Sequence, residues 1–411
     1  TGSSRQAKPG QRMADKQVDL RAEWQAFCNR LAGAGEVVLD PTQPGEDADR
    51  VEGFRHVLRS LYRAIGSGVE GGDVDFPELA WVHPSKSGQD NPDALYQAAR
   101  VDLTNTYRLT GNLGSACYLG ITLMTFDFGR APIEQLLTVN AQSLPGDSAG
   151  NIDVVFSPED PPPGRQDGTW FTLPPKACRF FVRQFFADWE AEEPARLHLE
   201  RVGATDPASR MSPDHLVGHL YGITREAVDL TAFWRDFGRT HLDAGQINSF
   251  DHIEADRQPN LAMGASPEQA YGQCWWHLQP SQALIYEVEV PECAYWGVQL
   301  GDVWYQSLDW VNRQSSLNGH QAVIDPDGVF RSVICEPDPG VANWLDTTGA
   351  TQGCITYRWN QADHAPVPTL TLVALNEVDD HLPAFTSRVD PEERAETLNR
   401  RRRAALRRFL R

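Results

Sequence analysis

The sequence lacks the short motifs that mark the common catalytic classes. It has no Walker phosphate loop and no Gly-x-Gly-x-x-Gly following an apolar strand, and its Gly146-Asp-Ser-Ala-Gly150 string follows Pro145 instead of the apolar strand that precedes a nucleophile turn. These absences disfavour a serine hydrolase of the α/β type, a P-loop enzyme and a dinucleotide-binding enzyme. We expect no organic cofactor.

Long apolar runs and closely spaced cysteines are also missing. No stretch approaches the roughly 20 apolar residues that cross a bilayer, and no secretory signal is evident. The 7 cysteines are widely spaced and form no Cys-x-x-Cys pair, so buried free thiols are expected instead of a zinc site. These features predict a soluble cytoplasmic protein that has no membrane partner.

Positive charge is scarce. The formal net charge is -19, and a surface this acidic repels phosphate backbones, so nucleic acid is not an expected partner. Hydrophobic residues at 41% and charged residues at 23% are typical of a globular protein. The composition therefore indicates a folded protein without a nucleic-acid partner. A small-molecule substrate or ligand is the expected partner, and a homo-oligomer stays open.

The length of 411 residues is too great for a single ordinary core and predicts at least two domains. We predict N-terminal helices with a β-rich domain over residues 13–210, a helical connector over 211–250, and a C-terminal β-sandwich with a closing helix over 251–411. Residues 1–12 are polar and lack a starting Met, and we interpret them as a cloning remnant.

Apolar residues recur at helical spacing in several segments. The predicted helices cover residues 18–31, 49–65, 212–245 and the segment after Asp390. Gly33 is expected to end the first helix. Ser212 and Pro213 are a typical N-cap and first-turn proline for the longest one, and Asp390 with Glu393 predicts a capping box.

Runs of β-branched and aromatic residues between Gly, Pro and Asp clusters predict short antiparallel strands. These runs cover residues 107–110, 116–126, 152–156, 178–186, 197–202, 283–290, 295–300, 321–324, 329–334, 354–359 and 370–375. The turn from Asp325 to Gly328 predicts a hairpin that joins 321–324 to 329–334. The predicted fold class is α+β, predominantly an antiparallel β-sandwich or jelly roll with N-terminal, central and C-terminal helices.

Several longer motifs carry a family resemblance. They are Asp90-Asn-Pro-Asp-Ala-Leu-Tyr96, Tyr107-Arg-Leu-Thr-Gly111, Ser307-Leu-Asp309 through Asn312 to His320, Asp338-Pro-Gly340 and Asn343-Trp-Leu-Asp346. Together they resemble the bacterial proteins that carry the conserved domain of unknown function 1214, over most of residues 75–410. The resemblance implies a jelly-roll-like sandwich with accessory helices, and it implies no particular activity.

Residues 304–320 concentrate polar and aromatic side chains in one strand-loop-strand passage. If these side chains converge, His320 can act as acid or base, Asp309 can orient it, and Arg313 can stabilise developing negative charge. The predicted substrate-binding residues are Trp304, Tyr305, Trp310, Asn312, Asn318 and Trp344. The alternative is that these groups satisfy the backbone of their own loop, with Asp309 paired to Arg313.

His215 and His219 stand four residues apart on a predicted helix and share one of its faces. They are weak candidates for metal ligands, with Asp214, His241 or His252 as a third ligand. A packing interface explains the same spacing.

Three functions follow from these patterns. The first is an enzyme of the lyase, hydratase or hydrolase type that uses acid-base chemistry on a small, partly apolar molecule. The alternative is a non-catalytic small-molecule or carbohydrate-binding protein. The second alternative is a metal-dependent enzyme that uses His215 and His219.

Overall fold

The structure is a computed structural model, and it describes residues 18–41, 47–70, 72–82, 85–126, 131–165, 167–205, 210–254, 264 and 266–409. Residues 1–12, which we interpret as a cloning remnant, lie outside the described residues.

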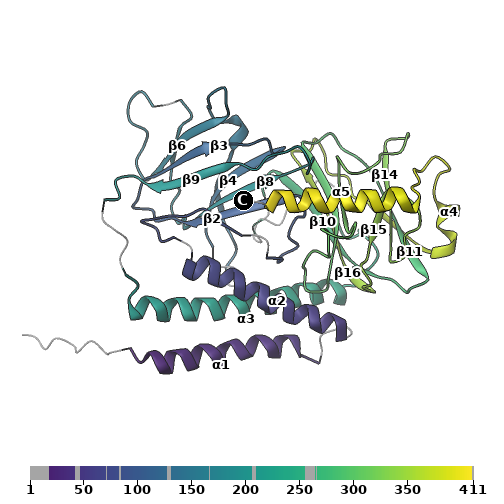
Figure 1. Ribbon diagram of the computed structural model, residues 1–411, viewed down its shortest axis with the longest axis horizontal. Helices are drawn as coiled ribbons and strands as arrows, with labels where there is room; N and C mark the ends of the chain where they lie inside the picture. The colour runs from purple at the N-terminus through teal and green to yellow at the C-terminus, as the bar shows by residue number, and fades with distance from the viewer. Residues whose placement is uncertain are drawn as a thin grey trace, which may run out of the picture.

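The first half of the chain forms a β-sandwich (Figure 1). Its strands are β1 (Ala80–Trp81), β2 (Ala94–Arg100), β3 (Tyr107–Asn112), β4 (Tyr118–Met124), β5 (Gln135–Asn140), β6 (Asn151–Ser157), β7 (Trp170–Thr172), β8 (Arg179–Phe185) and β9 (Arg196–Arg201). One sheet has the order β1-β2-β8-β4-β5 and the other β7-β6-β3-β9. Alternate residues of both sheets, including Leu109, Phe156 and Phe180, pack between them as a shared core.

The second half forms another sandwich. Its strands are β10 (Gln269–His277), β11 (Gln282–Glu289), β12 (Tyr295–Gly301), β13 (Ser316–Asn318), β14 (Val329–Cys335), β15 (Trp344–Asp346), β16 (Gln352–Asn360) and β17 (Thr369–Ala374). One sheet has the order β10-β16-β12-β13 and the other β15-β14-β11-β17. Its core includes Tyr286, Phe330 and Tyr357.

Three long helices lie along one side of both sandwiches (Figure 1). They are α1 (Leu20–Val38), α2 (Asp47–Ile65) and α3 (Pro213–Asp243), and both α1 and α2 pack on α3. The indole nitrogen of Trp304 donates to the backbone oxygen of Asp49 at 2.7 Å. A Cβ on Gly53 would lie 2.5 Å from the Trp304 ring, so glycine is what allows α2 to approach the second sandwich this closely.

The C-terminal helix α5 (Pro391–Phe409) follows the short helix α4 (Val378–His381) and joins the two sandwiches. Arg401 donates to the backbone oxygen of Trp310 at 2.7 Å, and Arg408 donates to that of Pro92 at 2.6 Å. Arg408 also lies 4.4 Å above the ring of Trp189. These contacts connect residues of both sandwiches through one helix.

Asp93 holds the same junction from inside. Its carboxylate accepts hydrogen bonds from Trp189, Tyr295 and Asn318, each at 2.7 Å. The three donors come from both halves of the chain, so one buried carboxylate helps to fix the relative position of the sandwiches.

The predicted fold class is confirmed, and so is the capping box, since Glu393 accepts from the backbone nitrogen of Asp390 at 2.9 Å while Asp390 accepts from that of Glu393 at 2.9 Å. Two local predictions are wrong. The first helix continues past Gly33 to Val38, because packing on α3 outweighs the roughly 1 kcal/mol propensity cost of a helical glycine.

The second wrong prediction is the strand over 321–324. The turn itself forms, since Gly328 donates to the backbone oxygen of Asp325 at 2.9 Å. However, the backbone nitrogen of Val323 donates to Oδ1 of Asn343 at 2.9 Å, and the backbone oxygen of Val323 accepts from Nδ2 of Asn343 at 2.6 Å. A side chain therefore takes the backbone bonds that a neighbouring strand would have made.

Across the described ranges, no helix is both long and apolar enough to span a membrane.

Candidate ligand-binding cavity

The three predicted catalytic side chains have separate partners. The His320 side chain is 56% exposed, and its Nε2 lies 3.7 Å from Asp188. Asp309 accepts from the side-chain amide of Asn312 at 3.0 Å, and Arg313 forms a two-point ion pair with Asp346 at 2.6 and 3.0 Å. The structure does not bring these three groups to a common site, and Asp309 is not paired with Arg313.

The six predicted substrate-binding residues divide into two groups. Trp304 packs under α2, Asn318 bonds Asp93, and Trp344 donates to the backbone oxygen of Cys335 at 2.9 Å. The other three, Tyr305, Trp310 and Asn312, border a large cavity, and so does the predicted catalytic residue Asp309. Part of the 304–320 passage therefore supports the fold, and part of it reaches a site.

The two candidate metal ligands lie near the start of α3, where His215 is exposed and His219 half-buried. Among the residues that the structure describes, no group of three or more His, Cys, Asp or Glu side chains is placed to hold a metal ion. His241 and His252 instead lie at the other end of α3 and beyond it, where both border the cavity.

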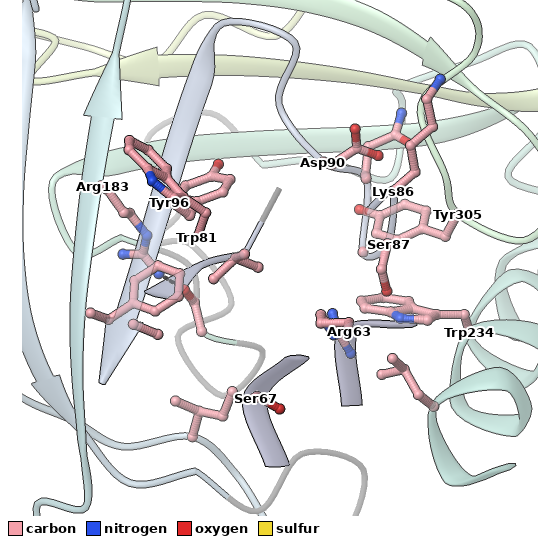
Figure 2. Close-up of a pocket in the computed structure, with 18 of the residues that line it drawn as sticks. Arg63, Ser67, Trp81, Lys86, Ser87, Asp90, Tyr96, Arg183, Trp234 and Tyr305 are labelled. Atoms are coloured by element: carbon pink, nitrogen blue, oxygen red, sulfur yellow. Dashed lines mark hydrogen bonds between the residues drawn. The ribbon is translucent and has the colours of Figure 1, made fainter. Parts of the chain in front are cut away.

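The cavity has a volume of about 1930 Å³ and lies between the two sandwiches and the helical layer. One wall is the face of the β1-β2-β8-β4-β5 sheet that points away from its own core. The opposite wall includes residues of β10 and β16 and the segment 86–90, and α2 and α3 complete the boundary. Figure 2 shows Trp81, Tyr96 and Arg183 on one side, facing Lys86, Tyr305 and Trp234 on the other.

Strand alternation builds the first wall. Along β8, Phe180 and Val182 point into the sandwich core, whereas Arg179, Phe181 and Arg183 border the cavity. On the neighbouring strand β2 their partners in register are Arg100, Ala98 and Tyr96, respectively, and these also border the cavity.

Arg183 is 7% exposed, and its guanidinium donates to a backbone carbonyl. Its Nη2 donates to the oxygen of Gly264, and its guanidinium lies 5.0 Å from the Phe181 ring. Its Nη1 is buried without a hydrogen-bond partner in the described structure. One edge of this buried guanidinium therefore has no acceptor among the described residues, and the residue borders the cavity.

Arg179 is half-buried and lies against an aromatic ring. Its guanidinium lies 3.9 Å from the centre of the Phe126 ring. Burial lowers the pKa of Arg179 to about 10, although the nearby Glu226 carboxylate opposes this shift. Both arginines of β8 thus bring positive charge into a poorly solvated wall.

The opposite wall holds two more cations by neutral acceptors. Arg358 donates to the backbone oxygen of Gln89 at 2.6 Å, and Lys86 donates to that of Ser307 at 2.8 Å. Burial lowers the pKa of Lys86, with the charge of Asp90 acting against the shift. Carbonyl groups orient these cations without neutralising them.

The helical side of the cavity is aromatic. Trp234 of α3 stacks on Tyr305 with ring centres 4.8 Å apart, and His241 stacks on Trp275 at 4.6 Å. Burial lowers the pKa of His241, so its imidazole is neutral near pH 7. Trp234, Tyr305 and His241 border the cavity and give it an aromatic surface beside its charged groups.

The cavity residues missed at the sequence level carried one recognisable signal. The segment Arg179-Phe-Phe-Val-Arg183 places two arginines on the same face of a predicted strand whose remaining residues are apolar. Such a strand is buried on both faces, so its arginines must face a partner, a cavity or a ligand. The pattern points to a buried charged wall, but the opposite wall comes from residues far away in the sequence.

Comparisons with known proteins match this chain to solved structures. No protein-family model matches the chain, and no curated protein does so, so the resemblance to domain of unknown function 1214 stays a prediction. The VPA0106 protein from Vibrio parahaemolyticus is 11% identical, with 83% of this chain and 99% of that chain covered and a TM-score of 0.42. That likeness is too low to support an argument.

The crystal structure of an uncharacterized protein from Burkholderia cenocepacia is much more similar. The two chains are 30% identical, the match covers 86% of this chain and 97% of that one, and the TM-score is 0.80. This protein therefore belongs to the same family as the uncharacterized protein from Burkholderia cenocepacia.

Proposed function

We propose that the protein binds a small, partly apolar molecule in the cavity between its two sandwiches. The observation that carries this proposal is the cavity of about 1930 Å³ with aromatic rings and charged groups on facing walls. Pockets for drug-sized ligands usually enclose about 300–1,000 Å³ and combine apolar walls with a few polar groups. This cavity has the same character and room for a longer molecule.

Buried polar atoms without partners support the proposal. They include the hydroxyl of Ser87, the side-chain amide of Gln89 and Nη1 of Arg183, and all three residues border the cavity. Buried polar groups in proteins are nearly always hydrogen-bonded. A ligand with complementary groups would satisfy these atoms.

The first function predicted from the sequence, acid-base catalysis by His320, Asp309 and Arg313, has less support. These groups lie apart and are engaged with Asp188, Asn312 and Asp346. Binding without catalysis accounts for the cavity with fewer assumptions. Its facing walls, with charged groups on both, favour a small molecule enclosed between them over a carbohydrate lying on a flat aromatic strip.

Catalysis on the bound molecule is a second candidate, favoured by His241. Its Nδ1 forms a hydrogen bond with the side-chain oxygen of Gln246. Because an amide oxygen can only accept, Nδ1 carries the proton and Nε2 is the basic nitrogen. The neutral imidazole is suited to act as a base. His252 lies nearby, with the ring centres 6.2 Å apart.

A fluorescent ligand tests the binding proposal. N-phenyl-1-naphthylamine is neutral, aromatic and bright only in apolar surroundings. Ala98 borders the cavity on β2, so Ala98→Trp should fill part of it and weaken binding of the probe about tenfold or more. Ala395→Trp, at an exposed position of α5, is the matched control and should bind like the unmodified protein.

The experiment has a clear contrary result. If Ala98→Trp is folded by circular dichroism and binds the probe as tightly as the control does, the cavity is not the binding site. Native mass spectrometry of the purified protein would then show whether the protein retains a small molecule at all. If Ala98→Trp loses such a retained molecule and the control keeps it, the proposal gains direct support.

A further inference from the structure

We infer that the ligand carries an anionic group, such as a carboxylate, sulfonate or phosphate, and that Arg183 binds it. This inference rests on the proposed function, because it assigns a chemical class to the molecule in the same cavity. The charge, burial and hydrogen bonds of one side chain carry it.

Arg183 is a buried cation without a carboxylate partner among the described residues. A guanidinium has five N–H donors, and the acceptor that Arg183 reaches is the neutral carbonyl of Gly264. Its Nη1 is buried and unpaired in the part of the chain that the structure describes. Burying an uncompensated charge costs several kcal/mol, and an anion bound in the cavity beside the guanidinium would offset that cost.

The acidic groups around the cavity are already engaged elsewhere. Glu226 pairs with Arg63 at 3.2 Å, and Asp309 accepts from Asn312. Asp90 accepts from the hydroxyl of Ser307 at 2.8 Å and from its backbone nitrogen at 3.0 Å. These carboxylates therefore do not take the place of a ligand anion at Arg183.

Two further acids, Glu268 and Glu78, do not neutralise Arg183 either. Glu268 accepts from the phenol of Tyr118 at 2.6 Å, and it is not ion-paired with Arg183 in the part of the chain that the structure describes. Glu78 also borders the cavity but is exposed to solvent, where its field is screened. The cations on the cavity boundary outnumber these acids; they are Arg63, Lys86, Arg100, Arg179, Arg183 and Arg358.

This local sign is opposite to that of the whole molecule. The chain carries a formal net charge of -19, so an anion approaching its surface is repelled on average. The cations on the cavity boundary are therefore best explained by a ligand of negative charge that binds between them.

The neighbours of Arg183 define the rest of the ligand. Phe181 lies two positions along the same strand, and its ring is 5.0 Å from the guanidinium. Tyr96 faces Arg183 across the β2 and β8 pairing, and burial raises the pKa of Tyr96 so that it stays a neutral phenol. An anionic head at Arg183 with a ring or chain lying along Phe181 and the aromatic floor fits this arrangement.

A matched pair of probes tests the inference. The neutral N-phenyl-1-naphthylamine and 8-anilino-1-naphthalenesulfonate share one aromatic skeleton and differ by a sulfonate. The unmodified protein should bind the sulfonate probe more tightly than the neutral one. Arg183→Met should weaken binding of the sulfonate probe by about tenfold or more, as expected for loss of a charge-assisted hydrogen bond, and change the neutral probe by less than about threefold.

Two further variants complete the design. Arg183→Lys keeps the charge without the planar fork and should lose less sulfonate binding than Arg183→Met. Arg402→Met removes an exposed arginine of α5 and should leave both affinities unchanged. Circular dichroism and size-exclusion chromatography show whether each variant is folded.

The outcomes separate this inference from the proposed function. If the unmodified protein binds the neutral probe as tightly as the sulfonate probe, or if Arg183→Met affects both equally, the anion inference is wrong and the cavity remains the binding site. If Ala98→Trp binds both probes as tightly as the unmodified protein does, the cavity is not the binding site, and both the proposed function and the anion inference are wrong. Should Arg183→Met not fold, the comparison of the two probes on the unmodified protein decides the inference alone.

Discussion

Arg183 on β8 lies directly opposite Tyr96 on β2 in the strand register, and both side chains reach the cavity between the sandwiches. The outer face of a sandwich sheet usually meets solvent and is polar for that reason. Here the first sandwich turns this face toward the second, and the helical layer covers the remaining side. The pairing of the two domains therefore creates a site that neither sandwich forms alone.

Replacing Arg179 should separate stability from binding. Arg179→Met removes a half-buried cation that stacks on Phe126 and whose pKa is lowered by desolvation, so the folded variant no longer bears the cost of desolvating that charge. We expect the free energy of unfolding to stay the same or rise by about 1 kcal/mol, while binding of the sulfonate probe weakens. Urea unfolding and probe titration measure the two effects.

The control for this prediction is Arg402→Met, which removes an equal charge from an exposed position. If Arg179→Met lowers the free energy of unfolding by more than about 2 kcal/mol, the side chain stabilises the fold through contacts that outweigh its desolvation. That result would identify Arg179 as a structural residue.

The local features of the fold were predictable because they depend on neighbours in the sequence. The Ser212 cap of α3 and the Asp390 cap of α5 both form as predicted, since a cap requires one side chain and the next turn. Gly33 misled the prediction because the packing of α1 on α3 joins segments almost 200 residues apart in the chain. Propensity is a weak prior where such packing decides the outcome.

The candidate site was less predictable for the same reason. The 304–320 passage is rich in functional residue types, yet Asn318 serves the junction through Asp93 and Trp304 serves α2. A sequence reveals which side chains are unusual in a segment. It does not reveal that Arg183 faces Lys86 across a cavity, because that depends on how two domains meet (Figure 2).

Replacing His320 should have little effect on either stability or binding. The side chain is 56% exposed and lies on the surface beside Asp188. His320→Ala should change the free energy of unfolding by no more than about 0.5 kcal/mol, as is usual for surface positions, and leave the affinity for both probes unchanged. A large loss of probe binding in a folded His320→Ala protein would return the site to the 304–320 passage.

Arg313 and Asp346 should behave as a structural pair. The Asp346 side chain is 3% exposed whereas that of Arg313 is 42% exposed, and burial raises the pKa of Asp346. Arg313→Gln leaves a buried carboxylate without its cation, so we expect a loss of about 1–3 kcal/mol, reduced by the partial exposure of the pair. Urea unfolding measures the change.

A double-mutant cycle tests whether the two groups act on each other. Arg313→Gln combined with Asp346→Asn should cost less than the sum of the single changes, because the neutral amide needs no cation. If the two costs simply add, the ion pair contributes nothing to folding and Arg313 is free for another role.

Asp302 should make stability depend on pH. Burial raises the pKa of its carboxyl group from 3.8 to about 7, with the charge of Glu52 acting in the same direction. The carboxyl group accepts from the backbone nitrogens of Trp304 and Gln306 at 2.9 and 3.0 Å. It therefore keeps its proton in the folded protein at pH values where the unfolded chain has lost it.

The direction of the effect follows from this difference in proton binding. Between about pH 4 and pH 7 the folded state holds one more proton than the unfolded state, so stability falls as the pH rises, by at most about 1.4 kcal/mol per pH unit. Below this window both states are protonated, and above it both are ionised. In either case the contribution of Asp302 is constant.

Asp302→Asn removes this titration and keeps an oxygen to accept the two backbone bonds. The difference in free energy of unfolding between the unmodified protein and Asp302→Asn should shift in favour of the variant as the pH rises from 4 to 7, and then level off. Urea unfolding of both proteins at pH 4.5, 6, 7.5 and 8.5 measures this difference. Parallel curves over the whole range would show that the carboxyl group is already ionised in the folded protein, and that its hydrogen bonds outweigh its burial.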